Sequence, residues 1–230
     1  ASRIEAETGV RPAVLPFASQ RVPHSATVTR EDRQQARQRL GLDEFPANTI
    51  HLGSFGYLDT RTKLTDVVVE AAGWLTQWGH TVALHLVGAG SESEIEKVSR
   101  RATEWGIHHL EVTGFQSEDR FRDWLLAVDL GVQLRVSPLL GVSGPLSDLA
   151  AFGTPAVASQ GLCLDVDTPT YIRPLADSVS PVTVAEAIEG ALAERLPDSE
   201  VEELRRAYLA RKSPARYAEL LLEEIEGSLR

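Results

Sequence analysis

The sequence predicts an α/β fold, with a Rossmann-like, doubly wound parallel sheet covered by helices on both faces. Short apolar runs, typical of buried strands, alternate along the chain with longer segments whose apolar residues recur at helical spacing. Parallel strands need long crossover connections, which are usually helices. The regular alternation of strands and helices therefore indicates a parallel sheet.

Composition narrows the class of protein. The chain of 230 residues is 43% hydrophobic and contains no run of about 18 apolar residues, so we expect a soluble globular protein without a membrane span. A formal net charge of −10 argues against nucleic acid as the main partner, because phosphate backbones are bound by clustered Lys and Arg. The single cysteine, Cys163, excludes an internal disulfide, and we expect a buried core thiol and a reducing, cytoplasmic environment.

Residues 1–45 read as an interdomain linker followed by a short helix. Three prolines break any regular structure in the first part, and an ordinary surface arm is the alternative interpretation. The helix is expected at residues 29–40, because Thr29 can cap it, acidic residues follow in its first turn, and Gly41 can end it.

The main part of the fold is expected between residues 46 and 195. We expect buried strands at residues 49–55, 81–87, 110–112, 130–134 and 156–158, with a shorter one at 171–172. We expect helices at residues 65–79, 92–105, 118–128, 145–152 and 182–196. Two more helices, at 199–212 and 214–226, fall in a C-terminal segment, residues 196–230, that should pack on the same domain.

The most informative stretch runs from Val128 to Ser159. A buried strand leads into a loop of small residues and proline, then a helix, a Gly-Thr-Pro turn and another buried strand. In open α/β sheets, ligands bind beyond the carboxyl ends of the strands, where loops of this kind lie. Pro145 suits the first helical position, with Ser143 and Gly144 before it as capping residues. The start of this helix should favour an anion.

This stretch resembles the donor-binding half of retaining GT-B glycosyltransferases, a family that includes glycogen synthases and bacterial mannosyl- and glucosyltransferases. The family motif ends in A-x-G-x-P-V-V-A-S, and residues 151–159 read A-F-G-T-P-A-V-A-S. Asp148 matches the second acidic residue of the motif, whereas residues 139–143, Leu-Leu-Gly-Val-Ser, lack the first one. The resemblance covers about residues 10–195. It implies one half of a GT-B fold, with residues 46–195 as the nucleotide-sugar-binding domain.

The resemblance implies that the chain binds a nucleoside-diphosphate sugar, whose sugar is transferred to an acceptor. The diphosphate would lie at the start of the 145–152 helix, near the N–H groups of Ser143, Gly144 and Leu146. Asp148 would accept hydrogen bonds from the ribose hydroxyls. The acceptor would be bound by an N-terminal domain outside this chain, and that domain could associate peripherally with a membrane. No catalytic residue is assigned.

Three further groups are candidate donor contacts, and each has a plainer interpretation. The resemblance implies that Lys63, with Arg61 in place of the usual arginine, holds the diphosphate, whereas both could be solvated charges at the start of a helix. Arg135 follows a strongly apolar strand, so its charge must be paired or must bind an anion. Gly114 and Phe115 stand where the family places the nucleobase, although a plain turn with Phe115 in the core is the alternative.

No cofactor and no metal ion is expected. None of the six histidines has zinc-like spacing with Cys163, and His85, His108 and His109 are interpreted as structural residues. Because the first acidic residue of the family motif is missing, a non-catalytic GT-B-derived binding or scaffold domain is the main alternative function. An unrelated Rossmann-like effector-binding module is the third.

Overall fold

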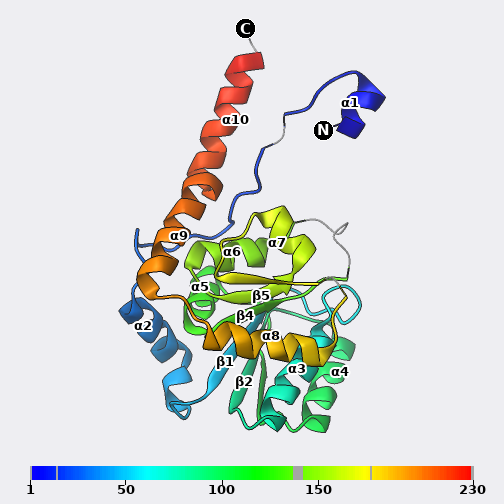
Figure 1. Cartoon of the computed structure of the whole chain (residues 1–230), viewed down its shortest axis with the longest axis vertical. Helices are drawn as coiled ribbons and strands as arrows, with labels where there is room; N and C mark the ends of the chain where they lie inside the picture. The colour runs from blue at the N-terminus through cyan, green and yellow to red at the C-terminus, as the bar shows by residue number, and fades with distance from the viewer. Residues whose placement is uncertain (1, 14, 137–141, 177, 229–230) are drawn as a thin grey trace.

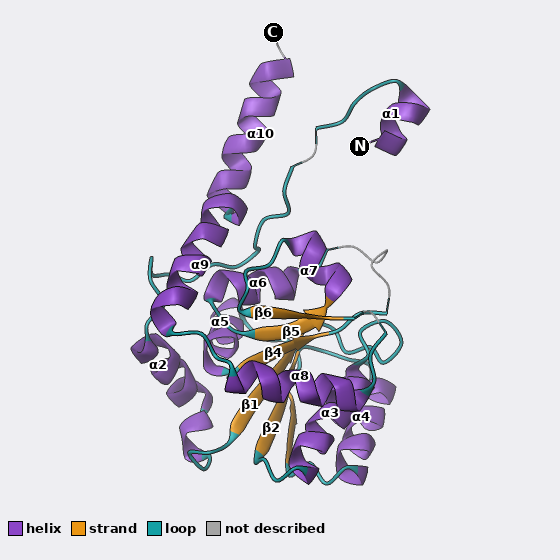
Figure 2. Ribbon diagram, viewed as in Figure 1, coloured by secondary structure: helices purple, strands orange, loops and turns teal. Residues whose placement is uncertain are grey.

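The structure is a computed structural model that describes residues 2–13, 15–136, 142–176 and 178–228. Its centre is one six-stranded sheet in which all neighbouring strands run parallel (Figure 1 and Figure 2). The strands are β1 (Ile50–Phe55), β2 (Val82–Val87), β3 (His109–Val112), β4 (Leu130–Gln133), β5 (Ala156–Ser159) and β6 (Ile172–Leu175). The predicted Rossmann-like parallel sheet is therefore confirmed.

The helices fall close to the predicted ranges. They are α1 (Ser2–Thr8), α2 (Arg30–Leu40), α3 (Thr65–Gln77), α4 (Glu92–Glu104), α5 (Glu118–Ala127), α6 (Gly144–Phe152), α7 (Gln160–Val166), α8 (Pro181–Ala193), α9 (Asp198–Lys212) and α10 (Pro214–Ser228), with a short 3₁₀ turn η1 (Leu42–Glu44). Two of them were not predicted. Helix α1 lies in the segment read as an irregular linker, and α7 lies between the strands expected at residues 156–158 and 171–172, where no helix was expected.

Helices cover both faces of the sheet (Figure 1). Helices α3, α4 and α8 pack together on one face, where their buried side chains form one apolar core with the strands. Helices α2, α5, α6, α7 and α9 contribute to a second core on the other face. Cys163 of α7 is buried in this second core, as predicted.

The strand order is β3-β2-β1-β4-β5-β6. Strands β2 and β3 are added on one side of β1, and strands β4 to β6 are added on the other side. The loop after β1 leads toward β2 on one side, and the loop after β4 leads toward β5 on the other. These two loops diverge at the carboxyl ends of β1 and β4, and this switch point is where ligands bind in open sheets of this type.

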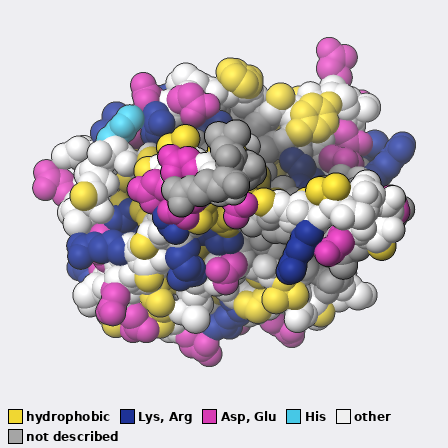
Figure 3. Space-filling view, turned by 90° about the horizontal axis from the view of Figure 1, so that it is seen from above, with side chains coloured by type: hydrophobic (Ala, Val, Ile, Leu, Met, Phe, Trp, Pro, Cys, Tyr) yellow, Lys and Arg dark blue, Asp and Glu magenta, His cyan; other side chains and the backbone are white. Residues whose placement is uncertain are grey.

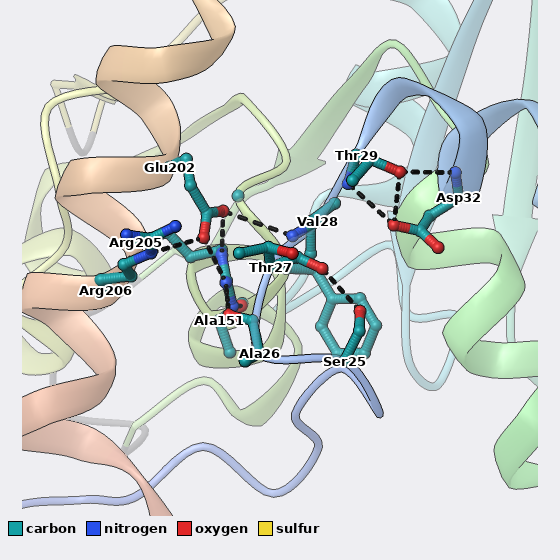
Figure 4. Close-up of polar contacts among 12 residues, drawn as sticks. Ser25, Ala26, Thr27, Val28, Thr29, Asp32, Ala151, Glu202, Arg205 and Arg206 are labelled. Atoms are coloured by element: carbon teal, nitrogen blue, oxygen red, sulfur yellow. Dashed lines mark hydrogen bonds and ion pairs between the residues drawn. The ribbon is translucent and has the colours of Figure 1, made fainter.

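Residues 19–29 pack against α6 and α9. Arg205 of α9 is 1% exposed, is paired with Glu202 at 2.7 Å, and donates hydrogen bonds to the carbonyls of Ala26 and Ala151 (Figure 4). Glu202 in turn accepts a hydrogen bond from the N–H of Val28. This segment is therefore held on the body of the domain by buried polar contacts.

The two C-terminal helices differ in their packing. Helix α9 buries Arg205 and Tyr208 against the domain, whereas no described side chain of α10 is buried and the helix projects away from the sheet (Figure 1). Helix α9 thus packs on the domain, whereas the described side chains of α10 remain at least partly exposed. The apolar spacing along residues 214–226 predicts that they form a helix. It does not predict which part of the protein packs against that helix.

The described part of the chain contains no helix that is long and apolar enough to cross a membrane. Basic and acidic side chains are interspersed over the face shown in Figure 3. That face shows no broad basic surface of the kind that binds nucleic acid.

Candidate functional site

The loops after β1 and β2 pack backbone against backbone at the carboxyl edge of the sheet. The N–H of Gly56 donates to the carbonyl of Val87 at 2.9 Å, and the N–H of Leu58 donates to that of Ala89 at 2.8 Å. A Cβ atom on Gly88 would lie 2.0 Å from the carbonyl oxygen of Gly56. Glycine is therefore required at position 88 by this close approach.

Asp59 orders the loop between β1 and α3. Its carboxylate accepts hydrogen bonds from the N–H groups of Arg61 at 2.8 Å and Thr62 at 3.3 Å, and from the Thr62 hydroxyl. These bonds, that of the Thr62 hydroxyl above all, hold the pKa of Asp59 below its usual range. Leu64 then adopts a left-handed conformation, with φ of 52°, immediately before α3. Such strain in a non-glycine residue is typical of functional loops.

Lys63 is directed from this loop toward the start of α6. A Cβ atom on Gly56 would lie 2.8 Å from Lys63 Nζ and 3.5 Å from Pro145 Cγ, so Gly56, Lys63 and the first turn of α6 lie close together. Burial lowers the pKa of Lys63, and the positive charge of Arg135 lowers it further. Two cations thus lie near each other at the switch point, and the negative charge of Asp59 acts in the opposite direction on Lys63.

The loop after β4 is hydrogen-bonded to its neighbours on both sides. The N–H of Arg135 donates to Ser159 Oγ at 2.9 Å, at the end of β5. The N–H of Val136 donates to the carbonyl of Thr62 at 3.0 Å, in the loop after β1. These bonds hold Arg135 beside the Lys63 loop.

The start of α6 is capped as the sequence predicted. Ser143 is the N-cap, and its hydroxyl accepts a hydrogen bond from the N–H of Leu146 at 3.3 Å. Helix α6 begins at Gly144, one residue earlier than expected. Because the hydroxyl of Ser143 occupies the N–H of Leu146, the donors left at this helix end are the N–H groups of Ser143 and Gly144. The predicted contact of a diphosphate with the N–H of Leu146 therefore has to compete with the cap.

The structure places Asp148 away from the open edge. Its side chain is 0% exposed, and Oδ1 accepts hydrogen bonds from the N–H groups of Gln20 at 3.1 Å and Arg21 at 2.9 Å. Oδ2 accepts a hydrogen bond from Arg21 Nη1 at 2.9 Å. Burial raises the pKa of the Asp148 carboxyl, and the hydrogen bonds from Arg21 oppose that rise. No atom of Asp148 is exposed in this structure, so the ribose contact, which stays a prediction, would require the carboxylate to leave these hydrogen bonds.

The loop after β3 adjoins the same edge. Thr113 Oγ1 accepts a hydrogen bond from the N–H of Gly88 at 3.2 Å, so the second and third loops are in contact. Gly114 has a left-handed φ of 67°, and Phe115 beside it is 91% exposed. The alternative that placed Phe115 in the core is therefore wrong. An exposed aromatic ring beside these loops offers a stacking surface to a planar ligand.

The remaining predicted residues lie at the margin of the site. Arg61 is exposed, and its backbone N–H donates a hydrogen bond to Asp59 Oδ1 at 2.8 Å. Of the stretch 139–143, in which the family motif has its first acidic residue, residues 139–141 lie outside the described residues.

One residue near the site was missed by sequence reasoning. A Cβ atom on Gly144 would lie 3.1 Å from Gln20 Oε1, so the side-chain amide of Gln20 lies over the start of α6. More than a hundred positions separate Gln20 from α6, and no local pattern links them.

Comparison with known proteins identifies the architecture. No protein-family model matches the chain, and no curated protein matches its sequence. Among solved structures, Anabaena HepE in complex with UDP and glucose superposes with a TM-score of 0.68 at 18% identity, over 87% of this chain and 53% of HepE. WaaG, a glycosyltransferase involved in lipopolysaccharide biosynthesis, gives 0.68 at 17% identity, over 90% and 55%. The C-terminal domain of the group 1 glycosyl transferase LpcC from Francisella tularensis gives 0.60 at 15% identity, over 81% and 95%.

These similarities establish the fold. The chain has the architecture of the C-terminal half of a GT-B glycosyltransferase, as the sequence resemblance implied. It spans about half the length of HepE and WaaG.

Proposed function

We propose that this chain is the donor-binding half of a retaining glycosyltransferase and holds a nucleoside-diphosphate sugar at the switch point between β1 and β4. The observation that carries the proposal is the convergence of Lys63, Arg135 and the start of α6 at that point. HepE, which shares the fold, was solved with UDP and with UDP-glucose.

The chemistry of the site suits a departing diphosphate. Cleavage of the bond between sugar and diphosphate leaves negative charge on the diphosphate, and fixed positive charge stabilises that charge most where water is scarce. Lys63 and Arg135 supply full charges, and the N–H groups of Ser143 and Gly144 supply the positive end of the α6 dipole. In this proposal Arg61 approaches from the outer side of the loop, and the base lies against Phe115 beside Gly114.

By the same proposal, the acceptor is bound by a domain outside this chain, through which the protein could also contact a membrane surface. The lengths of HepE and WaaG support this view, since each is about twice as long as the part matched here. Asp148 has no ribose contact in this proposal. Instead it anchors residues 20 and 21, and so holds the side chain of Gln20 over the start of α6.

Calorimetric titration with UDP, GDP and their sugar conjugates tests the proposal. Lys63→Gln should weaken diphosphate binding about tenfold to a hundredfold, because a hydrogen bond to a charged group contributes about 1.5–3 kcal/mol. Lys212→Gln is the matched control, since it removes the same charge from the last turn of α9, far along the chain from the site. If the two variants bind equally well, the diphosphate lies elsewhere.

A non-catalytic binding role is the second candidate, because residues 139–143 contain no carboxylate. In the family that this stretch resembles, the carboxylate contacts the transferred sugar, so its loss should remove discrimination between sugars. Free diphosphate and its sugar conjugates should then have dissociation constants within about tenfold, or about 1.4 kcal/mol. A sugar nucleotide that binds about a hundredfold tighter than its diphosphate would favour an active transferase instead. If no nucleotide binds, the scaffold alternative is favoured.

A further inference from the structure

Four polar side chains gather on the sheet face that α5 covers, within strands β1, β2 and β3. The register pairs His51 with Ala83, Ala83 with His109, and His85 with Glu111. Side chains alternate between the two faces along a strand, so His51, His85, His109 and Glu111 all lie on one face. Strands of a parallel sheet covered on both faces normally carry apolar residues there, so this cluster calls for a specific explanation.

The rings and the carboxylate are close enough to share one ion. His85 is 0% exposed, with Nδ1 3.0 Å from Glu111 Oε2 and Nε2 3.1 Å from His51 Nδ1. One ligand atom from each of His85, His109 and Glu111 lies within 4.8 Å of the other two. Three ligands of a tetrahedral zinc ion lie about 3.3 Å apart, given Zn–N distances of about 2.0–2.1 Å, so small side-chain rotations would bring these atoms together.

Two buried nitrogen atoms at this cluster lack partners. His109 Nε2 and Trp124 Nε1 are buried, and neither forms a hydrogen bond within the described part of the chain. The Trp124 ring lies 4.7 Å from that of His85. A buried polar atom without a partner costs about 1–3 kcal/mol, and such atoms in native proteins are usually satisfied by an ordered water or an ion. For His109, a metal ion would supply the missing partner.

We propose that His85, His109 and Glu111 form a binding site for a divalent transition-metal ion of the zinc class. Two imidazole nitrogens and one carboxylate oxygen are a donor set that suits zinc and disfavours magnesium or calcium, which prefer oxygen ligands. All three ligands stand on adjacent strands, which hold them more rigidly than loops would. Glu111, whose side chain is 40% exposed, leaves a route from solvent and room for a water as fourth ligand.

His51 and Phe45 complete the site without touching the metal. When His85 binds metal through Nδ1, its proton lies on Nε2 and is donated to His51 Nδ1. Metal-bound histidines commonly have such an outer partner, which fixes the ring and its tautomer. Phe45 lies edge-on to both His51 and His109, with ring centroids 5.2 Å and 4.7 Å away, and restrains both rings.

The ion would have a structural role and would not depend on the proposed sugar transfer. It would tie β2 to β3 at Glu111, three residues before Gly114. The spacing of histidines and cysteines along the chain does not indicate this site. The ligands are brought together by strand register instead.

The test uses the tag-free chain, stripped of metal with a chelator and titrated with Co²⁺ and with Zn²⁺. We expect one equivalent of Co²⁺ to give the visible absorption bands of a four-coordinate site, and Zn²⁺ to abolish them and raise the melting temperature. His109→Phe, which keeps the aromatic contact with Phe45, and Glu111→Gln should each weaken metal binding at least tenfold. His108→Phe changes the neighbouring exposed histidine and should bind metal as the parent does.

The chelated proteins provide a folding control. His109→Phe removes a buried nitrogen that has no partner, so without metal this variant should be at least as stable as the parent chain. Absence of the Co²⁺ bands in the folded parent would overturn the proposal. It would be overturned equally if His109→Phe bound metal as tightly as the parent, because other histidines would then be the ligands.

Discussion

Replacing Asp148 by alanine should destabilise the domain far more than it affects nucleotide binding. The substitution removes the acceptor of three hydrogen bonds, two from backbone N–H groups of Gln20 and Arg21 and one from the Arg21 guanidinium. Breaking a buried ion pair by removing one partner costs about 3–5 kcal/mol. Arg21 keeps its pair with Glu118 at 2.8 Å, and its side chain is 20% exposed. We therefore expect Asp148→Ala to lower the free energy of unfolding by about 3 kcal/mol, the lower end of this range.

The expected loss is large enough to measure by two methods. For a chain of this size, 1 kcal/mol shifts the melting temperature by about 2–4 °C, so Asp148→Ala should lower it by about 6–12 °C. Urea unfolding should show a lower midpoint with an unchanged slope. Asp148→Asn is the matched variant. It keeps an oxygen for the two backbone N–H groups, but its amide NH₂ faces Arg21 Nη1, so both the negative charge and the hydrogen bond from the guanidinium are lost. Asp148→Asn should lower the free energy of unfolding by about 1–2 kcal/mol.

Nucleotide titration of the same variants decides between the two roles of this residue. Because the carboxylate is fully buried, folded Asp148→Asn should bind nucleoside diphosphates within about twofold of the parent chain. The reasoning is refuted if Asp148→Asn keeps its stability within about 0.5 kcal/mol but binds nucleotide more than tenfold more weakly. The carboxylate would then have to turn toward the ribose, as the family resemblance implied.

Three other substitutions test how the site is built. Gly88→Ala places a methyl group 2.0 Å from the carbonyl oxygen of Gly56. We expect urea unfolding to show a free energy of unfolding lower by about 1–3 kcal/mol or more, and nucleotide binding to be weaker. An unchanged unfolding midpoint would contradict the close approach. Ser143→Ala removes the cap of α6 and should cost about 0.5–2 kcal/mol, measured by thermal unfolding; no loss would mean that the cap hydrogen bond is not made in solution. Arg205→Met leaves the partly buried Glu202 with the exposed Arg206 as its remaining ion-pair partner in the described chain, and should lower the free energy of unfolding by about 3 kcal/mol. Adding Glu202→Leu should recover part of that loss, whereas additive losses would argue against the pair.

Local signals in the sequence were sufficient for most of the elements. The capping pattern around Thr29 and Gly41 predicted α2, and the structure shows a capping box at Thr29 and a left-handed Gly41. Ser143 and Pro145 marked the start of α6 to within one residue. These signals act within a few residues of one another, so a single chain displays them without any knowledge of the fold. The short helix α7 was not predicted, although no proline lies inside it.

Local signals in the sequence could not predict where a side chain lies relative to segments that are distant along the chain. The sequence placed Asp148 on α6, but the face it occupies is decided by residues 20 and 21, which lie some 127 positions away. The histidines of β1, β2 and β3 meet only because the register aligns them. Likewise, Lys63 and the start of α6 are neighbours because β1 and β4 are adjacent in the sheet. The sequence by itself determined the fold class, the helix caps and the loops that would carry the site, since periodicity and capping depend on neighbours along the chain. Only the tertiary structure decided which of those residues meet, because strand order and register depend on how the whole apolar surface is buried.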